Sequence, residues 1–210
     1  MRPLTSDLLL RAYASGIFPM ARSRDDSRLY WIDPDQRGIL PLDAFHIPHS
    51  LRKVLRQGGF EIRCDTAFEA VMRACGEATS DRPDTWINEE IITLFVELFR
   101  FGLAHSVEAW QNGELVGGLY GLSLGAAFFG ESMFSRRTNA SKVVLVHLVA
   151  RLRHAGYRLL DTQFVTDHLK QFGAVEIPRI EYQRLLSEAL DEQAAFDRSP
   201  DTPWELALTT

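Results

Sequence analysis

The sequence predicts a mixed α/β (α+β) protein, in which an antiparallel hairpin precedes a strand, a long helix and a further strand. Three observations favour this class. The 210 residues are 46% hydrophobic and 24% charged, a composition typical of a globular protein that can bury a core. The dipeptide Asn112-Gly113 is a strong hairpin signal, because both residues tolerate a positive φ. A long apolar helical pattern at 139–155 lies between two strand-like segments.

The first part of the chain is expected to form loops and short strands. Residues 18–48 contain four prolines, at positions 19, 34, 41 and 48. Because proline interrupts both helices and the interiors of sheets, this density favours turns and short strands.

Three amphipathic helices are expected next. Each follows a residue whose side chain can accept hydrogen bonds from the free N–H groups of a first helical turn. These expected caps are Ser50, Asp65 and Asn88. The apolar faces are Leu51, Val54 and Leu55 in the first helix, Phe68, Val71 and Met72 in the second, and Ile91, Ile92, Leu94, Phe95, Leu98 and Phe99 in the third.

The pattern becomes strand-like from residue 105. Residues 105–110 and 114–120 form the predicted hairpin, and residues 126–133 form the third strand. The helix at 139–155 follows, and Gly156 suits the left-handed conformation that ends many helices.

A fourth strand at 157–165 and a short helix, capped by Thr166 and ended by Gly173, complete the predicted domain. The remaining tail is acidic and is expected to form a solvated surface. Its acidic residues are Glu181, Glu188, Asp191, Glu192, Asp197, Asp201 and Glu205.

Charge and segment lengths limit the possible partners and compartments. The formal net charge is -5, so a polyanion would need a local basic patch. No apolar run reaches the ~18 residues that span a bilayer, and residues 1–7 lack a secretion-signal pattern. Cys64 and Cys75 cannot build a disulfide framework, which favours a reducing cytoplasm.

The common cofactor motifs are missing. The sequence contains no phosphate-binding Gly-x-x-x-x-Gly-Lys-Ser/Thr loop, no Gly-x-Gly-x-x-Gly and no His-Glu-x-x-His. The histidines show no metal-ligand spacing, so neither a metal nor a nucleotide coenzyme is expected.

Three polar residues are candidates for chemistry. Asp161 and Gln163 lie two apart in a predicted strand and therefore share one of its faces. Glu131 lies among apolar residues, where a carboxylate needs hydrogen-bond donors. A solvated pair at a sheet edge has the same spacing as Asp161 and Gln163, so the pattern alone leaves both interpretations open.

A basic turn follows Glu131. Arg136, Arg137 and Lys142 surround the start of the next helix, whose N-terminus favours anions such as phosphate. Residues 131–170 contain seven Lys and Arg residues against three acidic residues. A solvated helix face fits this modest excess equally well.

Nine segments of the sequence match one known family: residues 13–19, 31–37, 85–87, 105–108, 114–121, 129–136, 139–142, 160–163 and 172–179. Taken in order, they resemble the leucyl/phenylalanyl-tRNA–protein transferase family, and the block at 130–136 is the most specific of them.

The resemblance implies a small N-terminal domain at 1–60, shorter than in many members and therefore expected to be partly truncated, and a GNAT-like acyltransferase domain at 61–210. It implies an enzyme that moves Leu or Phe, and less well Met, from aminoacyl-tRNA to proteins that begin with Arg or Lys. Such a transfer marks those proteins for N-degron degradation. The tRNA ester is already activated, so no cofactor is expected, and a cytoplasmic monomer is the expected form.

The resemblance also implies roles for particular residues. Asp161, Gln163 and Glu131 would be catalytic, with Asp161 either orienting Gln163 or attracting the charge on the attacking amine. Both side chains would converge on the reacting centre without being needed to fill the core. The substrate-binding residues would be Trp86, Leu119, Phe128, Met133, Leu148, Leu152 and Leu160. The tRNA-binding residues would be Arg136, Arg137, Lys142, Arg52, Lys53 and Arg56.

The sequence departs from the family pattern at several positions and leaves two rival functions. Met20 replaces a tryptophan, Thr166 replaces an asparagine, and leucines stand at pocket positions that are often Phe. An acyl-CoA-dependent N-acyltransferase would need a glycine-rich pyrophosphate loop, which the turn at 135–139 lacks. A non-catalytic RNA-binding adaptor would not need Asp161, Gln163 and Glu131.

Overall fold

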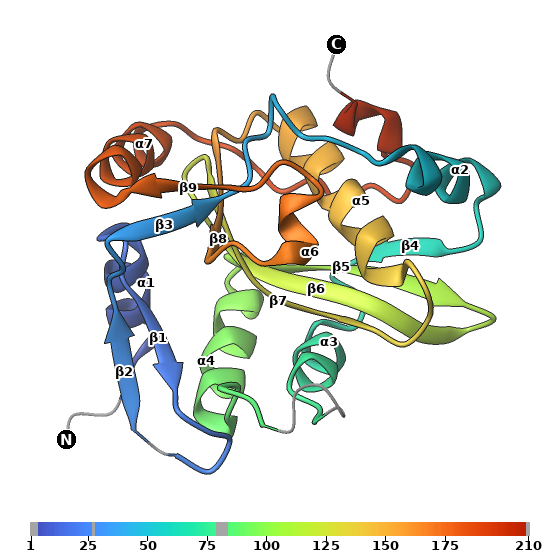
Figure 1. Ribbon diagram of the computed structural model, residues 1–210. Helices are drawn as coiled ribbons and strands as arrows, with labels where there is room; N and C mark the ends of the chain where they lie inside the picture. Colours follow the sequence, from blue (N-terminus) through green and yellow to red (C-terminus); the bar gives the residue numbers. More distant parts are fainter. Residues whose placement is uncertain (1–3, 27, 79–83, 209–210) are drawn as a thin grey trace.

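A twisted seven-stranded sheet forms the centre of the molecule (Figure 1). The computed structural model describes residues 4–26, 28–78 and 84–208. The strands in spatial order are β4 (Glu61–Cys64), β5 (Ala104–Gln111), β6 (Glu114–Leu124), β7 (Ala127–Ser135), β8 (Leu159–Gln163), β3 (Gln36–Ile39) and β9 (Val175–Pro178). A separate hairpin pairs β1 (Phe18–Ala21) with β2 (Leu29–Ile32). The mixed α+β class is confirmed.

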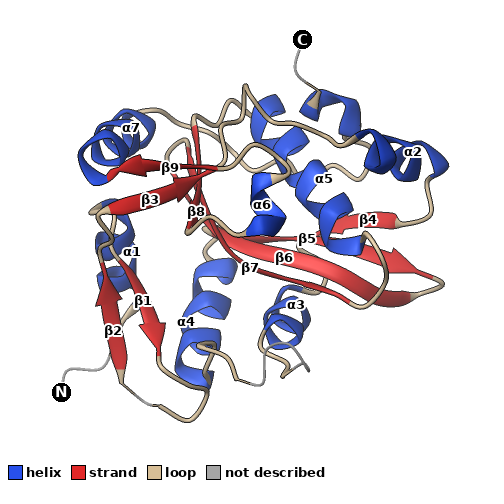
Figure 2. Ribbon diagram, in the orientation of Figure 1, coloured by secondary structure: helices blue, strands red, loops and turns tan. Residues whose placement is uncertain are grey.

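Helices cover both faces of the sheet (Figure 2). They are α1 (Ser6–Ala14), α2 (His49–Gln57), α3 (Phe68–Cys75), α4 (Glu89–Arg100), α5 (Ala140–His154), α6 (Asp167–Lys170) and α7 (Arg179–Asp191), followed by a 3-10 turn, η1 (Trp204–Ala207). Neighbouring strand residues project to opposite faces. Leu119 and Leu160 accordingly join the cluster under α2 and α5, whereas Tyr120 and Leu159 join the one under α3 and α4.

Strands β7 and β8 form a parallel pair joined through α5. Their pairing covers only 127–129 against 159–161, although both strands continue further. Beyond this short ladder the two strands separate, and the resulting opening sets the position of the candidate site.

The N-terminal third is built into the same body. Strand β3 pairs with both β8 and β9 inside the main sheet, and α2 packs against α5. Tyr13 and Phe18 share a hydrophobic cluster with Phe95 of α4. Strand β3 and helix α2, which precede the expected domain boundary at residue 60, therefore pack with elements that follow it.

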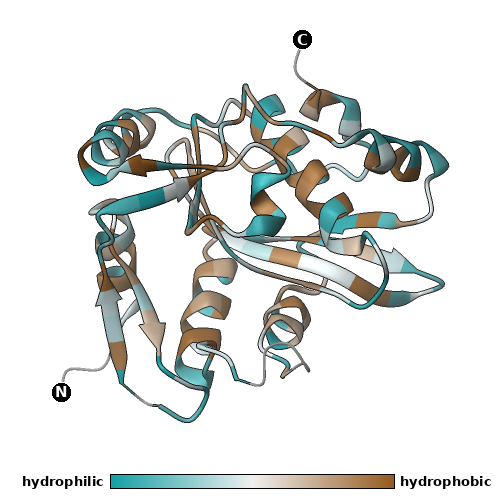
Figure 3. Cartoon of the chain, viewed as in Figure 1, coloured by the Kyte–Doolittle hydropathy of each residue, from teal (hydrophilic) through white to brown (hydrophobic). Residues whose placement is uncertain are grey.

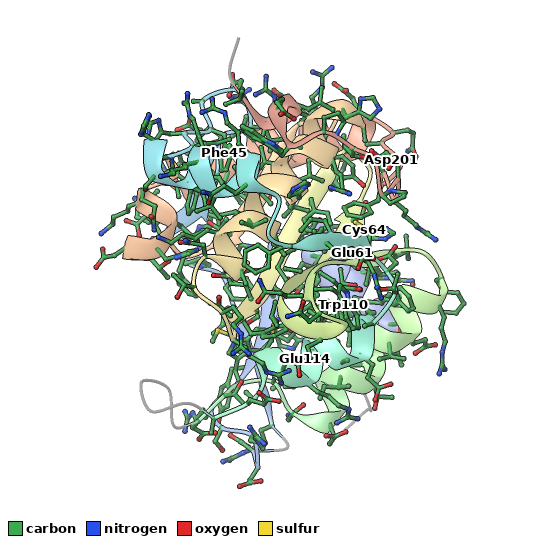
Figure 4. All side chains as sticks on the ribbon, turned by 90° about the vertical axis from the view of Figure 1, so that its right-hand side faces the viewer. Phe45, Glu61, Cys64, Trp110, Glu114 and Asp201 are labelled. Atoms are coloured by element: carbon green, nitrogen blue, oxygen red, sulfur yellow. The ribbon has the colours of Figure 1, made fainter. Side chains whose placement is uncertain are left out.

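The hairpin and several helix ends match the local sequence signals. Asn112 and Gly113 have φ values of 53° and 79°, as the hairpin turn requires. Asn88 accepts the N–H of Ile91 and caps α4, and Thr166 caps α6 in the same way. Figure 4 shows the edge of the seven-stranded sheet, where Glu61 of β4 lies opposite Trp110 of β5.

Two predicted caps were wrong. Helix α2, the first of the three predicted helices, begins at His49, so Ser50 lies inside it and does not cap it. Asp65 does not cap α3, because its carboxylate accepts the Ser106 N–H and contacts His105. The carboxylate of Glu108 instead accepts two backbone N–H groups at the start of α3.

The acidic tail is solvated on its charged side and also contributes buried residues to the core. Its acidic side chains are largely exposed, as expected, but α7 buries Tyr182, Leu186 and Ala189 against the body. Figure 3 shows brown, hydrophobic segments on α4 and α5, the helices that cover the two sheet faces. Among the described residues, no helix is both long and apolar enough to cross a membrane.

Candidate active site

A cavity of about 390 Å³ opens where β7 and β8 separate. Residues 130–135 of β7 form one wall, and residues 162–164 at the end of β8 form the other. Most of the lining is apolar, and the larger apolar residues are Phe18, Met20, Trp86, Leu119, Met133, Phe134, Leu145, Leu148, Leu160, Phe164 and Leu169. The volume suits one small apolar group together with polar groups at its entrance.

Three side chains from distant parts of the chain meet at the polar end of the cavity. Gln163 Nε2 donates to Glu131 Oε1 over 3.0 Å. The Tyr13 hydroxyl donates to the same oxygen over 2.9 Å. Since the Gln163 amide nitrogen is used in this way, its carbonyl oxygen is left as the acceptor that the cavity can use.

The backbone of Gln163 is held in a strained conformation. Its φ is 57°, and Phe164 N–H donates to Thr162 O over 2.6 Å, which closes a tight γ-type turn. Asp161 Oδ1 accepts the Gln163 N–H over 2.7 Å. A Cβ at Gly38 would lie 2.6 Å from the Phe164 backbone, so glycine allows the neighbouring strand to approach this turn.

A buried ion pair stands behind this turn. Arg37 Nη2 lies 2.6 Å from Asp161 Oδ2, and the two side chains are 1% and 0% exposed. The Tyr182 hydroxyl donates to the same oxygen over 2.6 Å, and Arg37 Nη1 donates to Gly16 O over 2.9 Å. Asp161 is therefore fully engaged behind the cavity wall and does not line the cavity. Its contact with Gln163 is through the backbone.

The environment of Glu131 favours its protonated form. Burial raises the pKa of Glu131 to about 8, and the nearby Asp161 charge adds to this shift, while the bonds from Tyr13 and Gln163 and the Arg37 charge oppose it. At neutral pH the carboxyl is thus mostly protonated. Oε1 accepts two hydrogen bonds, which leaves Oε2 to carry the proton.

The raised pKa of Glu131 predicts a pH-dependent stability. Between the ordinary value of 4.5 and about 8 the folded protein holds a proton that the unfolded chain has lost. The free energy of unfolding should therefore fall as pH rises through this window, by at most about 1.4 kcal/mol per pH unit from this group. Denaturant titrations of the wild type and Glu131→Gln across the window measure it. Equal slopes in both proteins would show that Glu131 does not titrate there.

Most of the chain matches models of one known protein family. The leucyl/phenylalanyl-tRNA protein transferase family model matches residues 39–187, and the model of its N-terminal domain matches residues 2–35. The chain belongs to the leucyl/phenylalanyl-tRNA–protein transferase family.

Two curated members of the family align with nearly the whole chain. The leucyl/phenylalanyl-tRNA–protein transferase of Paramagnetospirillum magneticum is 77% identical over 208 residues, which are 99% of this chain and 100% of that protein. That of Rhodospirillum rubrum is 58% identical over 207 residues, 99% of this chain and 96% of that protein. A solved structure of L-PGS from Bacillus licheniformis covers 78% of this chain and 61% of its own, with 14% identity and a TM-score of 0.42.

The structure separates the residues that the family resemblance suggested for substrate binding. Five of them line the cavity: Trp86, Leu119, Met133, Leu148 and Leu160. Phe128 of β7 and Leu152 of α5 do not line it and are buried in the core between the sheet and α5. Among the suggested catalytic residues, Glu131 and Gln163 reach the cavity, whereas Asp161 lies behind its wall.

Three members of the polar network had no role in the sequence interpretation. Tyr13 and Arg37 lie in segments that matched the transferase family, so the signal was present without an assigned function. Tyr182 lies in the acidic tail, where no local pattern marked it. The network also accounts for the expected donors around Glu131.

The suggested tRNA-binding residues lie in two places, on α2 and around the start of α5. Helix α2 packs against α5 above the sheet (Figure 1). Lys53 and Arg56 are exposed on α2, while Arg52 donates to Ile47 O over 3.0 Å.

The basic turn before α5 is partly neutralised. Arg136 Nη2 lies 2.6 Å from Glu77, and Arg137 Nη2 lies 3.9 Å from Glu114. Lys142 donates to a glutamine side chain over 3.1 Å. An anion that binds here would have to compete with these surface pairs, which are individually weak.

Proposed function

We propose that this chain catalyses transfer of leucine or phenylalanine from aminoacyl-tRNA to the N-terminus of an acceptor protein. Membership of the leucyl/phenylalanyl-tRNA–protein transferase family carries this conclusion. The cavity supports it, because an apolar chamber meets a polar end at Gln163 and Glu131. We extend the proposal to acceptors that begin with Arg or Lys, to slower use of Met, to a role in N-degron degradation, and to a cytoplasmic monomer with a GNAT-like catalytic domain.

The polar end of the cavity suits aminolysis of an ester. The neutral α-amine of the acceptor attacks the ester carbonyl carbon, a C–N bond forms, and the C–O bond to the tRNA ribose breaks. The Gln163 carbonyl oxygen would accept a hydrogen bond from the attacking amine and orient it. The Glu131 proton would stabilise the developing oxyanion. The proton lost by the amine leaves on the ribose oxygen.

Asp161 has a positioning role in this proposal. Its charge is matched by Arg37, so it is poorly placed to attract a second positive charge on the amine. Through the Gln163 N–H it holds the strained turn that presents the amide.

The apolar chamber should select the amino acid. Leu148→Trp adds volume to a chamber whose lining is close-packed, so it should exclude phenylalanine more than leucine. The measurement is kcat/KM for phenylalanyl-tRNA and for leucyl-tRNA, with thermal unfolding to check the fold. Since one methylene changes discrimination by only ~1–3 kcal/mol, the wild type should use both donors. An equal loss for both donors in a stable variant would contradict a selective role for this wall.

The basic residues of α2 and of the turn before α5 should bind the tRNA backbone electrostatically. The affinity for tRNA should then fall steeply with added salt, because each neutralised phosphate releases counterions. Titrations over a range of salt concentrations should show a slope reduced by about one for Lys53→Gln or Arg137→Gln. Arg184→Gln on α7, at the opposite side of the molecule in Figure 1, is the control and should leave the slope unchanged. Salt-independent binding would place the tRNA elsewhere.

One transfer assay tests the proposed function. The purified protein is incubated with radiolabelled leucyl-tRNA and with peptides that begin with Arg or with Gly. Label should appear on the Arg peptide and not on the Gly peptide. Absence of transfer from every aminoacyl-tRNA would refute the function, and equal labelling of both peptides would refute only the acceptor preference.

A further inference from the structure

Two polar atoms in the cavity wall have no protein partner among the described residues. They are Thr162 Oγ1 and His168 Nε2, both buried. Both residues line the cavity at the separation of β7 and β8. Buried polar atoms are almost always hydrogen-bonded, and leaving one unpaired is destabilising. Two such atoms in one cavity therefore point to a polar group of the ligand.

The position of Thr162 defines which part of the donor it can reach. On β8 it lies between Leu160, which forms part of the apolar wall, and Gln163, which holds the polar end. Leu160 and Thr162 are two residues apart and lie on the same strand face, roughly 6.5–7 Å from each other. Thr162 thus stands between the chamber for the side chain and the place of reaction.

His168 approaches the same cavity from α6. Its ring centroid lies 5.5 Å from that of Phe172, and the two rings pack in a tilted arrangement. Burial lowers the pKa of His168, and the charge of Lys142 lowers it further. The ring is therefore neutral near pH 7, so one nitrogen can accept a hydrogen bond and the other can donate one.

We propose that Thr162 and His168 bind the free α-amino group of the leucyl or phenylalanyl ester, an inference that rests on the proposed function. The α-carbon of the donor carries the apolar side chain, the ester carbonyl and the amine. With the side chain against Leu160 and the ester carbonyl at the proton of Glu131, the third substituent would lie beside Thr162. An amine offers N–H groups and a lone pair, which match a hydroxyl and a neutral imidazole.

The proposal gives the enzyme a second specificity besides the shape of the chamber. A donor whose amine is acylated lacks the lone pair and carries extra volume at this wall. The enzyme would therefore select aminoacyl-tRNA with a free amine and reject N-acylated aminoacyl-tRNA of the same side chain. A site built to bind a substrate N–H discriminates strongly against analogues without it.

The test compares leucyl-tRNA with its deaminated analogue, which carries 4-methylpentanoate on the same tRNA and has a hydrogen in place of the α-amine. The ratio of the two kcat/KM values is measured in the wild type, in Thr162→Val and in His168→Phe. The wild type should favour leucyl-tRNA by about tenfold or more, and each variant should reduce this ratio several-fold. Comparing ratios removes the different intrinsic reactivity of the two esters. Thr162→Val should not lower thermal stability, because it replaces an unpartnered buried hydroxyl with a methyl group of similar size.

Thr93→Val is the matched control, since Thr93 is an exposed threonine of α4 that does not line the cavity, and it should keep the wild-type ratio. A wild-type ratio in both Thr162→Val and His168→Phe would overturn the proposal. The alternative is that the pair binds the ribose hydroxyl. In that case the effect of the two substitutions would disappear with a tRNA ending in 2′-deoxyadenosine and would persist with the deaminated donor, and this result would also overturn the proposal. Failure of the proposed function would look different, because the wild type would then transfer leucine from neither donor.

Discussion

Gln163→Ala is expected to lower the single-turnover rate of leucine transfer by about 100–1,000-fold, the usual loss when a preorganised hydrogen-bonding group is removed from a reacting centre. The amide joins the two cavity walls through its bond to Glu131 and leaves its carbonyl oxygen for the amine. The affinity for charged tRNA should stay nearly normal, because the apolar chamber and the suggested tRNA-binding residues are unchanged.

The measurement uses saturating leucyl-tRNA and a peptide that begins with Arg. Gln111→Ala is the matched control, since Gln111 lies at the far end of β5 and should leave the rate unchanged. Gln163→Met keeps the approximate length of the side chain and removes both the amide donor and the carbonyl acceptor, so it tests the loss of these hydrogen bonds without shortening the residue. Near-normal rates in both Gln163 variants would remove this residue from the mechanism and leave Glu131 as the main candidate.

Asp161→Asn is expected to destabilise the protein by about 3–5 kcal/mol, because it leaves the Arg37 guanidinium buried without its counter-charge. The family resemblance implied that Asp161 would not be needed to fill the core, but its side chain is fully buried in this ion pair. Equilibrium unfolding in denaturant measures the loss. The control is Arg179→Ala, which breaks exposed pairs with Asp33 and Asp35 and should cost about 0–1 kcal/mol.

A double variant separates stability from activity. Replacing both partners, with Arg37→Met and Asp161→Leu, removes the unpaired charge and should recover much of the stability. Transfer should nevertheless stay low, since nothing then holds the Gln163 N–H. Recovery of both stability and activity in the double variant would mean that the pair serves the fold alone.

Local signals account for the parts of the fold that the sequence predicted well. The Asn112-Gly113 turn and the caps at Asn88 and Thr166 depend on a few adjacent residues, and each formed as expected. Strand β3 could not be placed in this way, because its partners β8 and β9 lie more than a hundred residues along the chain. Its four residues carry too little pattern to specify that pairing.

Only part of the site was predicted, because the rest depends on contacts between residues that are distant in the sequence. Glu131 and Gln163 reach the cavity as predicted. Asp161 and Gln163 were expected to share a strand face, but the turn at Gln163 interrupts the regular alternation of the strand. A positive φ at a glutamine has no sequence signature, and it separates the roles of the two residues. The burial of Tyr182 in α7 was hidden by the acidic residues around it.

The polar network at the site also constrains when the enzyme can become active during its own synthesis. The network takes side chains from α1, β3, β7, β8 and α7, and Tyr182 of α7 follows all its other members along the chain. A nascent chain that has not yet released α7 from the ribosome lacks the hydroxyl that completes the Asp161 environment. Partial translation products should therefore be unable to draw amino acids from the charged tRNA that surrounds them on the translating ribosome.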